Sequence, residues 1–282
     1  MIKHTPVLLN AVLGALGDLR GHHIIDATFG AGGYTRAFLG AGAIVTAFDR
    51  DPNVATDAEQ IAIEFGSQFR FIPRPFSSMA ELTEKFDAIV FDLGISSMQI
   101  DVPTRGFSFR ADAPLDMRMS GDGPTVRDMF CVWSVDDLTR ILRDYGDVKQ
   151  ATAIARAIKQ QMPQTTFELK ELIHRPNDVA PVFQALRIAI NDEMGELNRA
   201  LAAVPNLLNV GGRCICVTFH SIEDRIVKNT FRNWTSDCGD PRLPTICVPR
   251  FNLIKSQTPD TQEIEQNSRA RSAHMRGVVK SY

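Results

Sequence analysis

Four short runs rich in β-branched and aromatic residues alternate with helix-forming segments over the first hundred or so positions of this 282-residue chain. The runs are expected as strands at His23–Thr28, Ala43–Phe48, Phe69–Ile72 and Phe86–Phe91. Helices are expected between them, over Tyr34–Leu39 and after Asp51-Pro52, where proline suits the first helical turn. Strands that alternate with helices are typical of βαβ units around a parallel sheet. The pattern therefore predicts a doubly wound α/β domain.

The pattern changes after Gly94, because roughly a hundred residues pass before the next convincing strand, at Cys214–Phe219. An unstructured loop of that length is uncommon inside a compact domain. Apolar residues three or four positions apart instead predict helices. They are expected over 136–143, 149–161, 167–173 and 181–204. We therefore expect a helical domain at 105–200, inserted into an α/β domain that comprises 1–104 and 201–282.

The part of the chain beyond Phe219 is expected to begin with a helix that ends near Phe231. Prolines at positions 241, 244 and 249 favour a loop over Asp237–Lys255. The run Ala273–Lys280 is expected to return as an edge strand of the sheet.

Charge is distributed unevenly along the chain. From Arg225 to Tyr282, ten Lys and Arg stand against five Asp and Glu, which gives this part +5 and leaves −7 for the rest. Such asymmetry favours a polyanion as partner, although the acidic cluster Asp260–Glu265 dilutes the basic surface.

No apolar stretch approaches the ~18 uninterrupted residues that a membrane-spanning helix requires. Near the N-terminus, Asn10 interrupts the apolar run and Asp18 and Arg20 follow, so an amphipathic first helix is expected in place of a secretory signal. Five cysteines without a C-x-x-C pair argue against both a disulfide framework and a zinc site. We expect a cytoplasmic protein that holds no metal and has no membrane partner.

The glycine-rich segment Asp26–Gly33 follows the first expected strand and runs into a helix. Glycines at the carboxyl edge of a parallel sheet let the backbone turn tightly and let a ligand approach the main chain. Thr35 stands where a third dinucleotide-binding glycine would be, so the dinucleotide interpretation is weakened. Asp49 ends the second expected strand, where a carboxylate can bond ribose hydroxyls. The two features together favour an adenosine-containing ligand over a plain tight connection.

Further polar residues follow the other strands that end at this edge. Asp92 leaves the fourth expected strand and is positioned for chemistry or cofactor contact, unless it only caps the next turn. Phe76 follows the third strand and is a candidate to cover an adenine ring, with core packing as the alternative. After Cys214–Phe219 come His220, Glu223 and Arg225, with Ser221 expected as a helix N-cap.

Seven ordered blocks resemble the bacterial small-subunit ribosomal RNA (cytosine-N4)-methyltransferase family, and they extend over nearly the whole chain. The blocks are His4–Leu9, Asp26–Gly33, Phe91–Ser97, Arg105–Phe109, Pro114–Met119, Phe183–Ile188 and Phe219–Arg225. The resemblance implies a Rossmann-like S-adenosylmethionine domain with an inserted helical substrate-recognition domain. It also implies methylation of the exocyclic N4 of one cytidine in the decoding region of 16S rRNA, within the small ribosomal subunit.

Carried over by motif, the resemblance implies a set of cofactor contacts: Gly32, Gly33, Tyr34, Asp49, Phe76, Asp92 and Gln99. Position 34 departs from the family's usual histidine, so a contact through its side chain is in doubt, while a backbone contact would survive the change. Ile222 replaces a usual leucine, a change from which little is expected.

The chemistry suggests further candidates. Cytosine N4 is a weak nucleophile, so the enzyme must align it with the methyl group and accept its proton. Asp92 and His220 are the candidate catalytic residues, with the role of Asp92 split between proton acceptor and cofactor contact. An unstacked base is commonly held by aromatic rings and Arg. The substrate-binding candidates are Arg105, Phe107, Phe109, Arg118 and His220, with core packing or ion pairing as the alternative for each.

Two other classes remain as alternatives. A nicotinamide-dependent oxidoreductase would explain only the first βαβ unit. A non-catalytic ribosome-assembly factor would need a lost cofactor site, which the intact Gly32, Gly33, Asp49 and Asp92 oppose. The oligomeric state, with a homodimer as one option, stays open.

Overall fold

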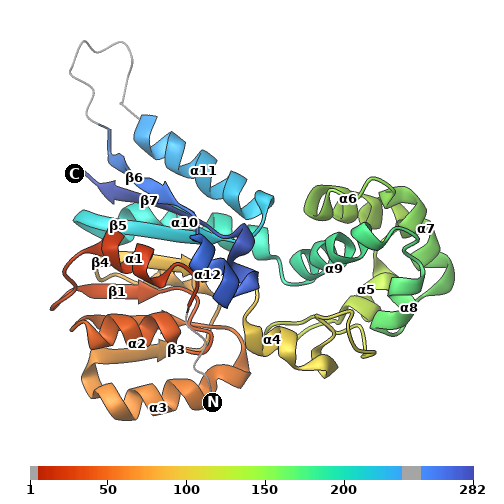
Figure 1. Ribbon diagram of the computed structural model, residues 1–282, viewed down its shortest axis with the longest axis horizontal. Coiled ribbons are helices and arrows are strands. Elements are labelled where there is room, and N and C mark those ends of the chain that lie inside the picture. The colour runs from red at the N-terminus through yellow and green to blue at the C-terminus, as the bar shows by residue number, and fades with distance from the viewer. Residues whose placement is uncertain (1–5, 237–248) are drawn as a thin grey trace. The chain divides into compact units, whose positions relative to one another are not determined.

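The computed structural model describes residues 6–236 and 249–282. The chain forms two compact units, which are described separately (Figure 1). We call Met1–Gly94 with Glu196–Tyr282 the sheet unit, and Ile95–Gly195 the helical unit.

The sheet unit is built on seven strands in the order β3-β2-β1-β4-β5-β7-β6. Their bounds are β1 His23–Asp26, β2 Ile44–Phe48, β3 Phe69–Ile72, β4 Phe86–Asp92, β5 Leu208–Thr218, β6 Phe251–Gln257 and β7 His274–Lys280. Strands β1 to β5 are mutually parallel, whereas β7 runs antiparallel to both β5 and β6. The predicted α/β class is therefore confirmed.

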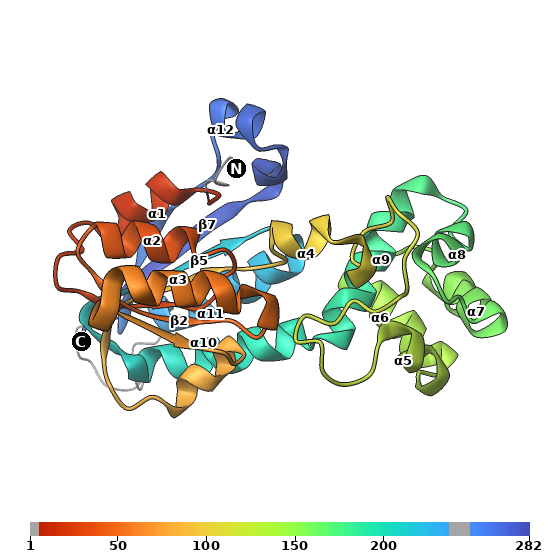
Figure 2. The ribbon, with the colours of Figure 1, turned by 90° about the horizontal axis from the view of Figure 1, so that it is seen from below.

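Helices cover both faces of this sheet, because consecutive residues of its central strands point to opposite faces. Ile24 packs with α1, α2 and α3 in one core, and Ile25 packs with α10 and α11 in another (Figure 2). The bounds are α1 Leu9–Leu16, α2 Gly33–Gly40, α3 Ala55–Phe65, α10 Glu193–Leu207, α11 Ser221–Ser236 and α12 Thr261–Gln266. Short 3-10 turns lie at Pro52–Val54, Gly66–Gln68, Phe76–Glu81 and Ser268–Ser272. Apolar residues on both faces explain why the strands read as continuous apolar runs.

The end of the sheet differs from the expectation. The edge strand is β6, within a segment expected as a loop, and β7 lies inside the sheet between β5 and β6. The prolines precede β6, and Phe251 anchors it by stacking on Trp234 of α11, with ring centroids 4.9 Å apart. The rest of the expected loop, positions 237–248, lies outside the described residues.

The fifth strand is also longer than expected, because β5 begins at Leu208 and not at Cys214. Its pairing with β4 shifts register between Phe86 and Ala88, opposite this stretch. Gly211 absorbs the irregularity with a φ of +81°. Cys214 and Cys216 lie farther along β5, where both are buried and free, and Cys131 is free and exposed. Cys238 and Cys247 lie outside the described residues.

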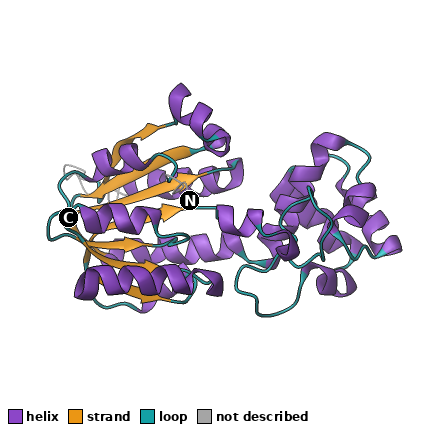
Figure 3. Cartoon of the chain, turned by 60° about the horizontal axis from the view of Figure 1, so that its bottom comes forward, coloured by secondary structure: helices purple, strands orange, loops and turns teal. Residues whose placement is uncertain are grey.

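The helical unit consists of helices and loops around its own core (Figure 3). Its elements are α4 Ser97–Asp101, a 3-10 turn Pro103–Arg105, α5 Val126–Val132, α6 Val135–Gly146, α7 Ala151–Gln161, α8 Thr166–Glu171 and α9 Pro176–Ile190. Helix α5 was not expected from the sequence, although Thr125 and Asp128 form a capping box at its start. None of the helices in the described part of the chain has both the length and the apolarity that a membrane crossing requires.

The single helix expected over 181–204 is two helices, α9 and α10, separated at Asn191 and Asp192. The Asn191 side chain accepts from Met119 N at 2.8 Å and donates to Met117 O at 2.7 Å. Asp192 adopts a φ of +48°, which no helix interior allows. The break therefore secures the segment around Met117 within the helical unit.

The helical unit begins ten residues before the position expected from the sequence. Ile95 already packs against the helical core, and Leu197 of α10 already packs against the sheet core. Side-chain packing thus sets the divisions at Gly94 and Gly195, whereas a change in sequence pattern placed them at 105 and 200.

Candidate functional site

The glycine-rich turn between β1 and α2 requires glycine at position 32. Gly32 is the N-cap of α2 and has a φ of +75°. A Cβ atom there would lie 2.6 Å from Ile61 Cδ1 and 3.1 Å from the ring of Phe29. Both the backbone conformation and the lack of space exclude a side chain. The helix N-terminus consequently keeps its backbone amides uncovered by a side chain at this position.

Asp49 connects the ends of β1 and β2. Its Oδ2 accepts from Gly30 N at 2.8 Å, and its Oδ1 accepts from Asp51 N at 2.8 Å. Burial raises the pKa of the Asp49 carboxyl. Each carboxylate oxygen has a second lone pair, so Asp49 can hold the turn and still accept from a ligand hydroxyl.

Tyr34 faces into the sheet unit, with only 3% of its surface exposed. Its hydroxyl donates to Val7 O, and its ring lies 5.8 Å from that of Phe38, centroid to centroid. Burial, followed by the charges of Asp92 and Asp26, raises the pKa of the Tyr34 hydroxyl. The Tyr34 side chain is thus part of the core that supports the turn.

Two carboxylates, Asp26 and Asp92, end the adjacent strands β1 and β4. Asp26 Oδ2 accepts from Thr35 Oγ1 at 2.7 Å, and burial raises the pKa of Asp26 to about 6. Asp92 N donates to Thr28 Oγ1 at 2.7 Å. Asp92 Oδ1 is buried, and no donor in the described part of the chain bonds to it. A buried carboxylate oxygen without a donor is costly, which points to a ligand as its partner.

Burial raises the pKa of Asp92 well above its ordinary value of 3.8, and the charges of Asp26 and Glu223 raise it further. The carboxyl ends of the parallel strands therefore gather negative groups that disfavour one another's ionisation. A cation bound beside Asp92 would relieve this repulsion.

Phe76 starts the 3-10 turn after β3 and is partly buried. Its ring meets that of Phe91 edge to face, with centroids 5.7 Å apart. Phe76 therefore packs on the core with one part of its ring, and the accessible remainder can still contact an adenine.

His220, and not Ser221 as expected, is the residue immediately before α11. Asp224 N donates to His220 O at 3.1 Å, which makes His220 the N-cap and Ser221 the first helical residue. Glu223 Oε2 accepts from Phe219 N at 2.8 Å and from His220 N at 3.3 Å, so a carboxylate caps this helix start. Arg225 follows on the same helix.

The remaining candidates lie in the helical unit. Gln99 is buried, and its Oε1 accepts from Ser96 N at 3.0 Å in a capping box. Arg105 donates through Nη2 to Arg118 O at 2.9 Å and to Met119 O at 2.8 Å. Arg118 forms a bidentate ion pair with Asp116 at 2.7 and 2.8 Å. Both arginines are thus held in fixed positions by protein groups.

The two phenylalanines of this unit belong to its core. Phe107 is 8% exposed and lies beneath the Arg105 guanidinium, with 5.3 Å between the Arg105 Cζ and the ring centroid. Phe109 is partly buried and meets Phe183 edge to face, at 5.4 Å between centroids. Core packing accounts for most of the Phe107 surface and for part of the Phe109 surface.

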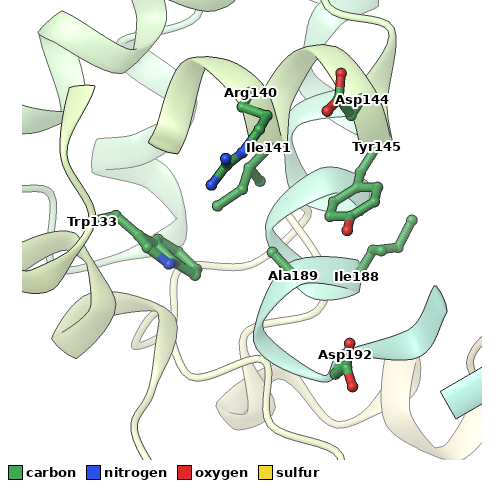
Figure 4. A pocket seen from close by; sticks show the side chains of 8 residues that line it. All are labelled: Trp133, Arg140, Ile141, Asp144, Tyr145, Ile188, Ala189 and Asp192. Atoms are coloured by element: carbon green, nitrogen blue, oxygen red, sulfur yellow. The ribbon is translucent and has the colours of Figure 1, made fainter. Parts of the chain in front are cut away.

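A pocket of about 290 Å³ opens between α6 and α9 of the helical unit (Figure 4). It is lined by Trp133, Arg140, Ile141, Asp144, Tyr145, Ile188, Ala189 and Asp192. Its walls combine two aromatic rings with charged groups of both signs. Apart from Ile188, which ends the block Phe183–Ile188, these residues were not singled out from the sequence, because their helical spacing gives no signal beyond core packing.

Comparison with known proteins identifies the family. The model of the MraW methylase family matches residues 1–281. The chain belongs to the MraW methylase family.

Curated relatives agree along the whole length of the chain. Ribosomal RNA small subunit methyltransferase H of Chelativorans sp. (strain BNC1) is 45% identical over 296 residues, which cover 99% of this chain and 87% of the relative. The protein of the same name from Bartonella quintana (strain Toulouse) is 44% identical over 298 residues, covering 99% and 90%. The resemblance inferred from the seven blocks is therefore confirmed.

Among solved structures, an rRNA methylase from Streptococcus thermophilus aligns with all of this chain and 99% of its own, at 14% identity and a TM-score of 0.45. That similarity adds nothing to the assignment to the MraW methylase family.

Several candidate residues lie at the same edge of the sheet unit. The structure brings together Gly32, Gly33, Asp49, Asp92 and His220 at the carboxyl ends of parallel strands. The acidic edge, the turn without a side chain at Gly32 and the unbonded Asp92 Oδ1 fit a cationic cofactor that carries hydroxyl groups. The helical unit holds the other candidates, which are Gln99, Arg105, Phe107, Phe109 and Arg118.

Two contacts at this edge were not predicted from the sequence: that of Thr28 with Asp92, and the capping of α11 by Glu223. Thr28 Oγ1 accepts from Asp92 N and so fixes the end of β4 against the turn after β1. Its position inside the glycine-rich segment was the only signal available. Glu223 was noticed as one of a polar cluster, but its spacing of three residues from His220 is also the spacing of an ordinary capping box.

Proposed function

We propose that this chain transfers the methyl group of S-adenosylmethionine to the exocyclic N4 of a cytidine in the decoding region of 16S rRNA. Membership of the methylase family over residues 1–281 and relatives named small-subunit rRNA methyltransferases support the reaction class and the RNA. The observation that carries the assignment to this site is the buried Asp92 oxygen without a donor, next to a glycine turn at a parallel sheet edge.

The cofactor supplies an electrophilic methyl group on a positively charged sulfur. Gly32 and Gly33 would approach it through the main chain, and Asp49 would accept from the ribose hydroxyls. Tyr34 would take part through its backbone, because its side-chain hydroxyl is bonded to Val7 O. Phe76 would lie against the adenine with the accessible part of its ring. For Gln99, the assignment rests on the family resemblance alone.

Asp92 is the group in this set best suited to the reacting amine. The N4 lone pair is conjugated with the cytosine ring, so its attack on carbon has to be accompanied by removal of a proton. Asp92 would take up the N4 proton as the methyl carbon exchanged its bond to sulfur, which would keep the electron pair, for a bond to N4. A positive charge bound beside Asp92 would keep the carboxylate ionised for this step, since opposite charges within ~4–6 Å lower a carboxyl pKa.

The RNA side of the proposal uses the helical unit and His220. The target base has to be unstacked, and aromatic and Arg side chains are the usual partners of such a base. Phe109 and Arg105 remain candidates. Arg118 is paired with Asp116, so its positive charge would be partly neutralised towards a phosphate. Phe107 would support Arg105 from below. A ribosomal-subunit substrate would place the protein in the cytoplasm, and a homodimer is compatible with this reaction.

The test is transfer of labelled methyl from S-adenosylmethionine to 30S subunits that lack the modification, followed by nucleoside analysis. Label in N4-methylcytidine supports the proposal, and free 16S rRNA assayed in parallel reports the assembly stage. Cofactor binding without transfer to either RNA would instead indicate an assembly factor.

A further inference from the structure

Glu223 lies in the first turn of α11 and is almost fully buried, with 1% of its surface exposed. Its Oε2 accepts from two backbone amides, those of Phe219 and His220, and so caps α11. In the described part of the chain, no Lys or Arg forms an ion pair with it, whereas the next residue, Asp224, pairs with Arg276 at 2.7 and 2.8 Å. A buried carboxylate kept without a cationic partner calls for an explanation beyond capping.

The second oxygen of Glu223 faces the imidazole of His220. Glu223 Oε1 lies 2.9 Å from His220 Nε2, and the His220 side chain is 11% exposed. Two lone pairs would repel at this distance, so Nε2 carries the proton. The N–H does not point along the line to Oε1, and no hydrogen-bond acceptor in the described part of the chain meets it. Glu223 Oε1 therefore keeps the proton on Nε2, while the buried N–H has no acceptor among the described residues and can donate to a ligand that reaches it.

The other ring nitrogen is turned to the helix. Glu223 N approaches His220 Nδ1 at 3.4 Å, with Nδ1 as acceptor. This long contact agrees with the same tautomer, in which Nδ1 has the lone pair and Nε2 has the proton. Glu223 thus meets both nitrogens of the ring, one through its backbone and one through its side chain.

The same edge of the sheet holds Asp92. Strands β4 and β5 are adjacent, Asp92 lies opposite Val217, and Leu93 N donates to Val217 O at 2.9 Å. Glu223 is close enough for its charge to act on Asp92. The His220 and Glu223 pair therefore belongs to the neighbourhood of the proposed proton acceptor.

We propose that Glu223 is a positioning residue: it holds the His220 imidazole with the proton on Nε2, so that His220 donates a hydrogen bond to the target base and Asp92 alone accepts the N4 proton. The proposal rests on the proposed function for the identity of the base. It removes His220 from the candidates for general base, because the nitrogen with the lone pair faces α11.

If Glu223 only capped α11, the variant Glu223→Gln should behave like the wild type. The glutamine oxygen can accept from the Phe219 and His220 amides as before, so the cap survives. Its NH₂ group would then face His220 Nε2 as a donor and would favour the tautomer with the proton on Nδ1. A purely structural Glu223 would tolerate this exchange, whereas a positioning residue would not.

The first measurement is the ¹⁵N chemical shifts of the His220 ring in the full-length protein labelled at histidine, since the two tautomers give distinct pairs of shifts. His220→Asn assigns the signal. We expect the wild type to carry the proton on Nε2 and Glu223→Gln to shift it towards Nδ1. The matched control is Asp224→Asn, which removes the neighbouring carboxylate and should leave the His220 signals unchanged. Identical shifts in wild type and Glu223→Gln would overturn the proposal.

The second measurement is a double-mutant cycle in the methyl-transfer assay. Glu223→Gln should lower kcat by about tenfold or more, and most of this loss should disappear in the His220→Asn background. An equal loss of kcat in that background would mean that Glu223 does not act through His220. If the wild type transfers no methyl group, the proposed function fails, while the ring shifts still decide whether Glu223 sets the tautomer.

Discussion

The hydroxyl of Tyr34 donates a hydrogen bond to the backbone carbonyl of Val7, which joins the first turn of α2 to the segment before α1. The next residue of that segment, Leu8, donates its N–H to Glu263 Oε1 at 2.5 Å. Pro6 fills the space beside Gly33, where a Cβ would lie 2.5 Å from Pro6 Cγ. The segment next to the proposed cofactor turn is thus secured by residues from both ends of the sheet unit.

Replacement of Tyr34 by Phe should reduce stability, because the change leaves the ring in place but removes the only donor to Val7 O that the described residues provide through a side chain. A buried hydrogen bond contributes about 1 kcal/mol, and urea denaturation of the two proteins should give a difference of that size. Cofactor affinity should change little if position 34 acts through its backbone. A large loss of affinity at unchanged stability would assign the hydroxyl to the cofactor instead.

Replacement of Gly32 by Ala should destabilise the protein by at least about 2 kcal/mol, since a residue with a φ of +75° would also press a methyl group against Ile61. Gly14→Ala is the matched control. Gly14 lies inside α1 with nothing within 4 Å of its Cβ position, so alanine there should increase the stability of the protein by about 0.5–1 kcal/mol. Equal effects of the two variants in chemical denaturation would refute the steric argument.

Asp26 should make stability decline as the pH rises. Its pKa is about 6 in the folded protein against 3.8 for the ordinary carboxyl, so the folded state binds the proton more tightly. This contribution is present in full below about pH 4 and is lost as the pH rises through about 6, and a shift of roughly two pKa units corresponds to about 3 kcal/mol. The stability of Asp26→Asn relative to that of the wild type should increase by up to that amount between pH 4 and pH 7. A difference between the two proteins that does not vary with pH would contradict this prediction.

Cofactor affinity should rise with pH because of Asp92. Burial raises the pKa of this carboxyl, so ionisation has to accompany the binding of a positively charged sulfonium. Calorimetric titration should show affinity for S-adenosylmethionine increasing with pH more steeply than affinity for the uncharged thioether product. In Asp92→Asn, the affinities for the two ligands should depend on pH to a similar extent. If the pH dependence still differed as in the wild type, a group other than Asp92 would be responsible.

The sequence predicted those parts of the fold that depend on local pattern. Ile24, Ile25 and their counterparts in β2 and β4 form continuous apolar runs, which identify buried parallel strands. The order of β6 and β7 could not be predicted, because it depends on Phe251 stacking on Trp234, a contact between segments that no periodicity reports. The break between α9 and α10 likewise depends on Asn191 bonding to Met117 and Met119, more than seventy positions away.

The candidate site shows the same division. Asp49 and Asp92 could be placed because residues that leave parallel strands gather at one sheet edge. The engagement of the Tyr34 hydroxyl with Val7 and of Arg118 with Asp116 could not, since side-chain partners are decided by packing. His220 as N-cap was missed because serine is the more common residue at that position.

The most direct test of the central claim is nucleoside analysis of 16S rRNA from 30S subunits incubated with S-adenosylmethionine and either the wild type or Asp92→Asn. Both proteins should bind the uncharged thioether product with similar affinity, which shows that the site is intact. We expect N4-methylcytidine with the wild type and a loss of at least about a hundredfold in its rate of formation with Asp92→Asn. Formation at the wild-type rate in the variant would contradict the assignment of Asp92 as the acceptor of the N4 proton.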